Sequence, residues 1–329
     1  MQDQYARKIE YVRISLTDRC NLRCRYCMPE NDIVKMPHAE MLTFTEILRV
    51  VRALAAVGIK KVRLTGGEPL VRHNLTELIY ALRQIPGIEQ VALTTNGVLL
   101  PRMAEELLQA GLTGLNISLD TLRAGTFAEL TRRPLFAQVQ AGLEKVLAMG
   151  VEQVKFNCVP IYEVNDDEIP ELAALAKDYP VQVRFIELMP IGCAYAAGYR
   201  GVPMTEVRAR LEKAYGRLCP VRKKSDPLQG PAQYYQLAGF AGRVGFIDAL
   251  EHSFCAACNR VRLTADGFLK LCLNQKNGLN LRELLRNGIS DDNLKRALQQ
   301  AVYRKPAEHL FRDSKNTAKD SRAMYQVGG

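Results

Sequence analysis

The most informative stretch of the chain is residues 11–27, which read YVRISLTDRCNLRCRYC. A short strand-like run at residues 11–16 leads through a polar turn into Cys20, Cys24 and Cys27. Three thiolates at this spacing can hold three irons of a cubane 4Fe–4S cluster and leave the fourth iron without a protein ligand. Zinc usually takes four tetrahedral ligands from pairs of the CxxC type, so the spacing favours a cluster over a zinc knuckle.

An aromatic residue, Tyr26, directly precedes the last cysteine of this triplet. The CxxxCxxC spacing with this aromatic resembles the signature of the radical S-adenosylmethionine (SAM) enzymes. An open iron at the end of a strand is where a small molecule can bind and accept an electron. The resemblance therefore predicts a cluster enzyme that uses SAM.

Composition is that of an ordinary folded soluble protein. Of the 329 residues, 47% are hydrophobic and 24% are charged. No apolar run approaches the roughly 18 residues needed to cross a bilayer, and the first residues lack the apolar stretch of a signal peptide. We therefore expect a cytoplasmic protein without a membrane partner. Nine cysteines in a reducing compartment indicate metal or cluster ligation more than disulfides.

The net charge of +10 predicts an anionic partner. Nucleic-acid binding usually shows as a clustered basic run. Here the Lys and Arg residues are scattered, apart from Arg222-Lys223-Lys224 and the C-terminal tail. A small molecule that carries phosphates fits better, because guanidinium forks match phosphate oxygens.

The first two thirds of the chain alternate strand-like and helix-like segments. The predicted strands are residues 11–16, 61–64, 90–95, 114–119, 152–160 and 181–187. The predicted helices between them are residues 43–57, 74–84, 101–110, 138–149 and 166–177. This alternation predicts βαβ units around a parallel sheet. Six such units form a partial barrel as easily as a flat sheet, and periodicity does not separate the two.

The pattern changes after about residue 190. Residues 261–264 and 268–272 predict a hairpin, helical patterns return at 281–286 and 291–303, and the polar end after residue 311 is a candidate for disorder. We expect two parts: residues 1–215, and a smaller C-terminal region at residues 216–329.

A second cysteine group lies in the C-terminal region. Cys255 and Cys258 are followed by Cys272 on the second strand of the predicted hairpin. Taken alone, the group fits a zinc site that lacks one ligand as well as it fits a cluster, and the first triplet favours a second 4Fe–4S cluster. Arg260 and Arg262 lie two apart on an extended segment, so their side chains share a face. Cys158, Cys193 and Cys219 lack ligand spacing, and we expect incidental thiols there.

The two triplets occur together with Gly66-Gly67-Glu68-Pro69 after a strand and with a terminal Gly328-Gly329. In this combination the chain resembles the molybdenum cofactor biosynthesis protein A family, the GTP 3′,8-cyclases. The resemblance implies an α/β fold, an incomplete (β/α)6 TIM-like barrel with a smaller C-terminal α+β region. It also implies two 4Fe–4S clusters and SAM as cofactors. The implied reaction is a radical SAM lyase reaction that converts GTP to (8S)-3′,8-cyclo-7,8-dihydroguanosine 5′-triphosphate, the first step of molybdenum cofactor biosynthesis.

The resemblance also assigns the binding residues. The first cluster is implied at Cys20, Cys24 and Cys27, and the second at Cys255, Cys258 and Cys272. The positions that match SAM contacts are Tyr26, Gly67, Ser118 and Met189, and glycine at 67 would leave space for a ligand. The positions that match GTP contacts are Arg13, Arg63, Thr94, Lys155, Arg260 and Arg262, with Arg184 as a weaker candidate.

The implied catalytic residues are Arg260, Arg262, Gly328 and Gly329. A frayed terminus is the plain alternative for the two glycines, whereas the family implies that they thread into the site. The implied partners are GTP, an electron donor of the flavodoxin or ferredoxin type, and cyclic pyranopterin monophosphate synthase as the next enzyme. We expect a monomer or a homodimer.

Two rival interpretations remain at the level of sequence. One is a radical SAM maturase with an auxiliary cluster that acts on a peptide or on RNA, and the net charge gives the RNA version some support. The other is a scaffold in which both triplets hold structural zinc. Iron and sulfide in the purified protein distinguish the cluster enzymes from the scaffold.

Overall fold

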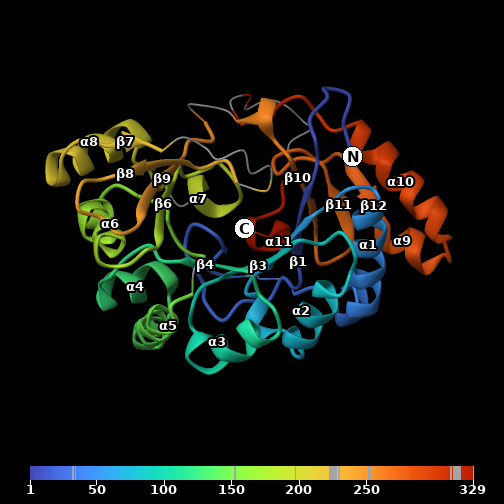
Figure 1. Cartoon of the computed structure of the whole chain (residues 1–329), viewed down its shortest axis with the longest axis horizontal. Coiled ribbons are helices and arrows are strands. Elements are labelled where there is room, and N and C mark those ends of the chain that lie inside the picture. Colours follow the sequence, from blue (N-terminus) through green and yellow to red (C-terminus); the bar gives the residue numbers. More distant parts are fainter. Residues whose placement is uncertain are drawn as a thin grey trace.

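A single sheet organises the chain (Figure 1). The computed structural model describes residues 1–31, 33, 35–151, 153–196, 198–221, 228, 230–250, 254–311, 313 and 320–328. Within these residues the strand order is β12-β11-β10-β1-β2-β3-β4-β5-β6-β9-β8-β7. The sheet curves into an open trough, and the described end of the chain lies inside the curve.

Six parallel strands form the middle of the sheet in chain order. They are β1 (Tyr11–Ser15), β2 (Lys61–Thr65), β3 (Gln90–Thr95), β4 (Gly114–Ser118), β5 (Val154–Cys158) and β6 (Gln182–Ile186). Each agrees with a predicted strand to within two residues at each end. Residue 152, the start of the fifth prediction, lies outside the described residues.

Two strands from the C-terminal half continue the parallel sheet on its two sides. β9 (Arg243–Ile247) pairs with β6, and β10 (Arg260–Leu263) pairs with β1. Antiparallel strands complete both margins: β8 (Gln233–Gln236) and β7 (Cys219–Pro220) on one side, β11 (Phe268–Lys270) and β12 (Gly278–Asn280) on the other. The predicted hairpin is therefore confirmed as β10 and β11. The division of the chain near residue 215 stays a prediction, and the strands on either side of it share one sheet.

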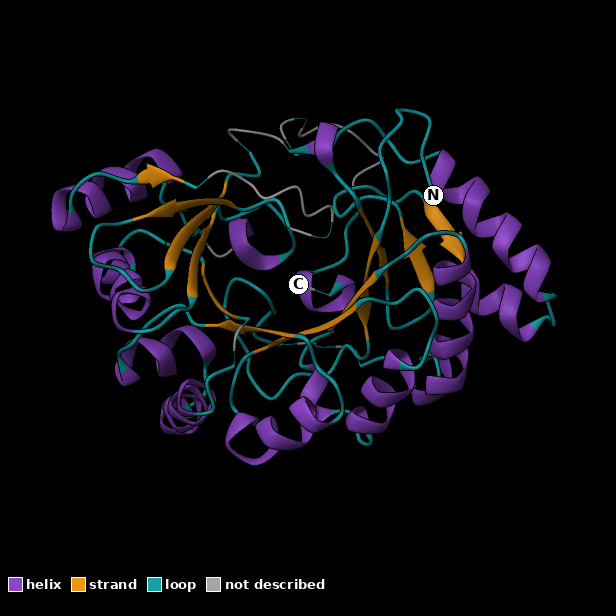
Figure 2. Ribbon diagram, in the orientation of Figure 1, coloured by secondary structure: helices purple, strands orange, loops and turns teal. Residues whose placement is uncertain are grey.

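Helices cover the convex side of the sheet (Figure 2). They are α1 (Phe44–Ala56), α2 (Leu75–Arg83), α3 (Leu100–Gln109), α4 (Ala124–Thr131), α5 (Phe136–Ala148) and α6 (Ile169–Asp178). α8 (Met204–Tyr215) packs near α6, and α10 (Asp291–Tyr303), which follows α9 (Leu281–Arg286), packs on α1. The short helices α7 (Cys193–Ala196) and α11 (Met324–Val327) lie inside the curve. Single 3-10 turns are η1 (His38–Glu40), η2 (Pro69–Val71), η3 (Asp166–Glu168) and η4 (Cys255–Ala257).

The two faces of the sheet differ sharply in chemistry. Alternate residues of a strand point to opposite faces. In β1 and β2, Val12, Ile14, Val62 and Leu64 are fully buried in the core shared with the helices, while the residues between them are mostly polar. Every charged residue within the eight parallel strands is Lys or Arg. The interior of a complete (β/α)8 barrel is usually packed with branched apolar side chains, so this polar concave face indicates a binding site.

Local sequence signals explain several boundaries. α1 begins at a capping box. The Glu46 backbone N–H donates to the Thr43 hydroxyl, and the Thr43 backbone N–H donates to the Glu46 carboxylate. Helical patterns at 281–286 and 291–303 are confirmed as α9 and α10. α4, α8, β8 and β9 were not predicted. β9 contains Gly245 and carries only a short apolar run, so its strand state depends on pairing with β6.

No helix among the described residues has the length and apolar character needed to span a bilayer. This finding agrees with the absence of an apolar run in the sequence.

Replacing Phe246 of β9 by alanine tests whether the C-terminal strands share the core of the first six. Phe246 is 1% exposed and stacks on Phe185 of β6, with ring centroids 6.3 Å apart. We expect Phe246→Ala to lower the free energy of unfolding by about 3–5 kcal/mol, measured in urea with one transition for the whole chain. Tyr303→Ala, at an exposed position, is the control. A separate early transition confined to the C-terminal half would contradict a shared core.

Candidate active site

The loop that carries the first three cysteines packs against the turn after β2. The Gly67 N–H donates to the Thr17 carbonyl (2.7 Å), and the Glu68 N–H donates to the Arg19 carbonyl (2.8 Å). A Cβ on Gly67 would lie 2.4 Å from the Arg19 carbonyl oxygen. The loop that presents Cys20 therefore requires glycine at this position. This contact could not be read from the sequence, which suggested only space for a ligand.

The thiols of Cys20, Cys24 and Cys27 lie close enough to influence one another. Burial raises the pKa of Cys20 to about 11 and that of Cys27 to about 12, and the charge of Cys20 adds to the shift at Cys27. Burial raises the pKa of Cys24 most, followed by the charges of Cys27, Asp120 and Cys20. Thiolates in such a site need a positive partner, and iron supplies one. The donor set therefore fits an iron–sulfur cluster.

No group of three or more His, Cys, Asp or Glu side chains in the described part of the chain converges on a single metal ion. A cubane does not require such convergence, because each thiolate bonds its own iron. Cys193, for which we expected an incidental thiol, lies near enough to Cys27 to raise the pKa of Cys27 slightly.

Asn96 is a neighbour of the cluster loop that sequence reasoning missed. Its Nδ2 donates to Asn21 Oδ1 (2.7 Å) and lies 3.7 Å from Cys20 Sγ, which also accepts the Leu22 N–H (3.4 Å). The Asn96 backbone N–H donates to the buried Glu68 carboxylate (2.8 Å). Burial raises the pKa of Glu68 to about 7, although the hydrogen bonds that the Glu68 carboxylate accepts oppose the shift. Hydrogen bonds to cluster sulfurs tune reduction potential, so Asn96 is well placed to act on the first cluster.

The residues assigned to SAM lie at the carboxyl ends of the parallel strands. Tyr26 donates from its hydroxyl to Asp120 Oδ2 (2.6 Å), and the Val159 N–H donates to Asp120 Oδ1 (2.9 Å). Ser118 is the last residue of β4, and Met189 follows β6. With Gly67 after β2, all four assigned residues border the same end of the sheet, where parallel α/β folds place their sites. Asp120, which holds Tyr26, was not assigned a role from sequence.

Positive side chains line the concave face where β10, β1 and β2 run side by side. Two neighbouring register rows cross these strands: Arg262, Arg13 and Arg63 in one, and Arg260, Tyr11 and Lys61 in the other. We name these six residues the cationic strip. Thr94 and Lys155 lie on the same face, in register with Asn116 of β4. All six residues assigned to GTP therefore share one face of the sheet.

Lys61 belongs to the cationic strip but was missed by sequence reasoning. It lies two residues before Arg63 on a strand, so the two side chains share a face of the sheet. This spacing could have identified Lys61 from the sequence. Arg184, the weaker candidate, lies further along the concave face, where its Nε donates to Asn157 Oδ1 (2.8 Å).

Tyr11 occupies the centre of the cationic strip. Its hydroxyl accepts a hydrogen bond from Arg63 Nε, and the Lys61 ammonium lies 5.5 Å from its ring centroid. Burial alone would raise the pKa of Tyr11, but Arg63, Arg13, Lys61 and Arg260 outweigh burial and lower the pKa to about 7. The strip therefore stabilises negative charge at its centre strongly enough to outweigh the effect of burial on a phenol. A phosphate group placed there gains from the same field.

The second cysteine group borders the other end of the strip. Cys255 and Cys258 precede β10, and Cys272 follows β11, so all three lie near the amino end of β10. Burial raises the pKa of Cys258, but Lys305 and Arg260 lower it to about 7. Burial lowers the pKa of Arg262 to about 10, and Cys272 and Cys258 oppose that shift. Cys258 and Cys272 are therefore within electrostatic reach of the strip, and the three thiols fit a cluster by donor chemistry.

The two cysteine groups lie at opposite ends of neighbouring parallel strands. The first follows the carboxyl end of β1, and the second precedes the amino end of β10. A strand of five residues is about 16 Å long, so roughly one strand length separates the two groups. The cationic strip lies along this interval.

The end of the chain lies across the same face (Figure 1). The Gly328 carbonyl accepts a hydrogen bond from Arg262 Nη1 (2.5 Å), and the Tyr325 backbone N–H bonds to the Cys27 sulfur. Gly328 has a φ of 76°, and a Cβ there would lie 2.9 Å from Thr65 Cγ2. The described tail is therefore packed inside the trough, and glycine suits its last described position. Gly329 lies outside the described residues.

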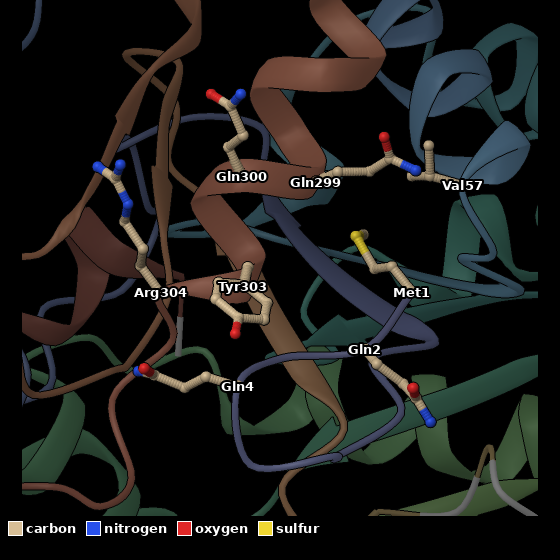
Figure 3. Close-up of a pocket in the computed structure, with 8 residues that line it drawn as sticks. All are labelled: Met1, Gln2, Gln4, Val57, Gln299, Gln300, Tyr303 and Arg304. Carbon is tan, nitrogen blue, oxygen red and sulfur yellow. The ribbon is translucent and has the colours of Figure 1, made fainter.

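A separate hollow of about 660 Å³ lies away from this site (Figure 3). It lies between the N-terminal segment, the end of α1 and the end of α10, and its lining is Met1, Gln2, Gln4, Val57, Gln299, Gln300, Tyr303 and Arg304. None of these residues is a cysteine, and Arg304 is the one among them with a charged side chain. We therefore take the cationic strip, and not this hollow, as the candidate active site.

Comparison with known proteins shows the family to which this chain belongs. Residues 14–176 match the sequence family described as the Radical SAM superfamily, and residues 181–311 match Molybdenum Cofactor Synthesis C. A GTP 3′,8-cyclase of Clostridium perfringens (strain 13 / Type A) is 46% identical over 329 residues, covering 100% of both chains. This chain belongs to the GTP 3′,8-cyclase family. A GTP 3′,8-cyclase of Pelotomaculum thermopropionicum is 47% identical over 331 residues, again covering 100% of both chains.

Solved structures support the fold of the family. Streptococcus suis SuiB bound to precursor peptide SuiA has a TM-score of 0.59 at 15% identity, over 95% of this chain and 70% of that chain. At this identity the similarity concerns the fold alone. The resemblance to the GTP 3′,8-cyclases and the incomplete barrel, both predicted from the motifs, are confirmed.

Gly67→Ala tests the packing that presents Cys20. The added Cβ would overlap backbone atoms of Arg19, so the loop must shift, and we expect SAM affinity to fall by roughly tenfold or more together with iron content. Iron and sulfide analysis and SAM-binding calorimetry under anaerobic conditions measure both. Gly125→Ala in α4 is the matched control, because a Cβ there meets nothing within 4 Å. Equal iron content and SAM affinity in the two variants would contradict this account.

Proposed function

We propose that this chain is the radical SAM lyase that converts GTP to (8S)-3′,8-cyclo-7,8-dihydroguanosine 5′-triphosphate at the start of molybdenum cofactor biosynthesis. One observation carries the proposal: a strip of five cations lies between two groups of three cysteines on one face of the sheet. Membership of the GTP 3′,8-cyclase family supports the same reaction. The enzyme acts in the cytoplasm under this proposal.

Two bound groups supply the chemistry that amino acids cannot. When bound, the first cluster would supply the electron that cleaves SAM reductively, and SAM would supply the radical that abstracts hydrogen from C3′ of the GTP ribose, so that C3′ can join C8 of guanine. Cys20, Cys24 and Cys27 would hold the first cluster, and Cys255, Cys258 and Cys272 the second. Tyr26, Gly67, Ser118 and Met189 would position SAM. The reaction consumes two electrons, so the proposal includes a flavodoxin- or ferredoxin-like donor.

The residues of the chain bind, orient and enclose the substrate. Arg13, Arg63, Arg260 and Lys61 present a fixed positive surface to the triphosphate, and guanidinium groups match phosphate oxygens in pairs. Thr94 and Lys155 extend this surface along the concave face. Gly328 would close it from the C-terminal side, where its carbonyl accepts a hydrogen bond from Arg262. Gly329, which the resemblance names as catalytic, lies outside the described residues. Fixing the ribose and base in reacting geometry accounts for a large part of the rate.

An anaerobic assay tests the proposed reaction. Cluster-loaded protein with SAM, reductant and GTP should form 5′-deoxyadenosine and a cyclised nucleotide in matching amounts, detected by mass spectrometry. Omission of GTP should abolish the nucleotide product. Formation of 5′-deoxyadenosine without a cyclised nucleotide would reject the substrate.

Arg260→Ala tests the cationic strip within that assay. The loss of one charge-assisted contact costs about 1.5–3 kcal/mol, so we expect GTP to bind about 10- to 150-fold more weakly. Arg52→Ala, on an exposed position of α1, controls for the change of net charge. Equal GTP affinity in both variants would remove Arg260 from the site.

Tyr11 predicts a pH dependence of GTP binding. Near pH 8 the free protein holds Tyr11 mostly as phenolate, since its pKa is about 7. The bound triphosphate adds negative charge beside it and raises the pKa, so GTP binding takes up a proton and weakens as pH rises above about 7. Calorimetry in buffers of different ionisation enthalpy measures the uptake. Tyr11→Phe should lose this component, and identical uptake in the wild type and the variant would contradict it.

A further inference from the structure

A buried ion pair connects the C-terminal tail to the edge of the sheet. The Lys270 side chain on β11 is fully buried, and its ammonium pairs with the Asp320 carboxylate and donates to the Gln275 carbonyl (2.8 Å). A lysine in this position is costly to bury without an anionic partner. Asp320 is the anion that the structure places there, and its side chain is 6% exposed.

Asp320 is itself held in a defined geometry. Its backbone N–H donates to the Asn274 carbonyl (2.8 Å). The Arg322 guanidinium contacts the Asp320 carboxylate at 3.0 Å and lies over the Phe268 ring at 5.2 Å. Residues 320–322 are therefore docked on β11 through charge, backbone and aromatic contacts together.

The ion pair lies beside the contact that holds the end of the tail. Lys270 of β11 is the cross-strand partner of Arg262 of β10, and Arg262 donates to the Gly328 carbonyl (2.5 Å). Two neighbouring cations thus hold the tail at residues 320 and 328. Between these points, Ala323 packs against Gly192, where a Cβ would approach its Cα to 2.9 Å.

We propose that the Lys270–Asp320 ion pair is the anchor that positions the tail in the active site, with Asp320 as a positioning residue. The Asp320 carboxylate pairs with Lys270 and Arg322, and neither of these residues belongs to the cationic strip or to the positions assigned to SAM. Without it, Lys270 would be an unpaired buried cation next to Arg262, and like charges would repel at the point where Gly328 is held. The proposal goes beyond the proposed function, and only its activity arm rests on that function.

Asp320→Asn in the full-length, cluster-loaded protein tests the anchor. We expect hydrogen exchange in residues 323–328 to accelerate by roughly tenfold or more, and formation of the cyclised nucleotide to fall by a similar factor. Asp292→Asn, which removes a carboxylate from an exposed pair with Lys295 on α10, is the matched control and should change neither quantity. Iron and sulfide content and melting temperature show whether each variant is folded.

Lys270→Met separates release of the tail from the cost of an unpaired lysine. It removes the buried charge together with the anchor, so it should release the tail without burying an unpaired cation. In the double variant the two changes should not add, because both remove one attachment. Unchanged exchange at 323–328 in both single variants would overturn the anchor, as would a released tail with full turnover. If the wild type forms no cyclised nucleotide, the proposed reaction fails, while the exchange measurements still decide on the anchor.

Discussion

Mutual repulsion among the cations of the concave face is the constraint on which the rest of the site depends. Arg13, Arg63, Arg260, Arg262 and Lys61 lie in two adjacent register rows, and the parallel strands around them contain no Asp or Glu. Such an arrangement costs free energy unless negative charge is nearby. Tyr11 and Cys258, whose pKa values the neighbouring cations lower to about 7, can supply some, and a triphosphate would supply more. The same cations therefore lower the stability of the fold and favour binding of a polyanion.

The arrangement requires two distant parts of the chain to meet. β1 supplies Arg13 and leads directly into the first cysteine loop, whereas β10 supplies Arg260 and Arg262 directly after Cys258. Parallel pairing of β1 with β10 places these arginines side by side. One strand pairing thus fixes the order of first cysteine group, cationic strip and second cysteine group. The same pairing joins both halves of the chain in one sheet.

Local signals in the sequence were enough to predict much of this structure. The six core strands follow from apolar alternation, and the two cysteine triplets follow from spacing. β9 could not be predicted, because its strand state comes from pairing with β6 across more than fifty residues of chain. Lys61 could have been found from its spacing to Arg63. The roles of Asn96, Asp120 and Asp320 could not have been found in this way. Each of them acts through a hydrogen bond or ion pair with a residue that is remote in sequence. The contact of Gly67 with Arg19 was hidden for the same reason.

The short antiparallel strands at the two margins of the sheet have a consequence for association between molecules. A barrel that does not close keeps two edges, and unpaired edge backbone invites other chains to add strands. In the part of the chain that the structure describes, the outermost strands are β7, with two residues ending in Pro220, and β12, with three. Proline cannot donate to a ladder, and three residues offer few bonds. The barrel therefore stays open, while its short edge strands offer few backbone groups to which the strand of another molecule could bind.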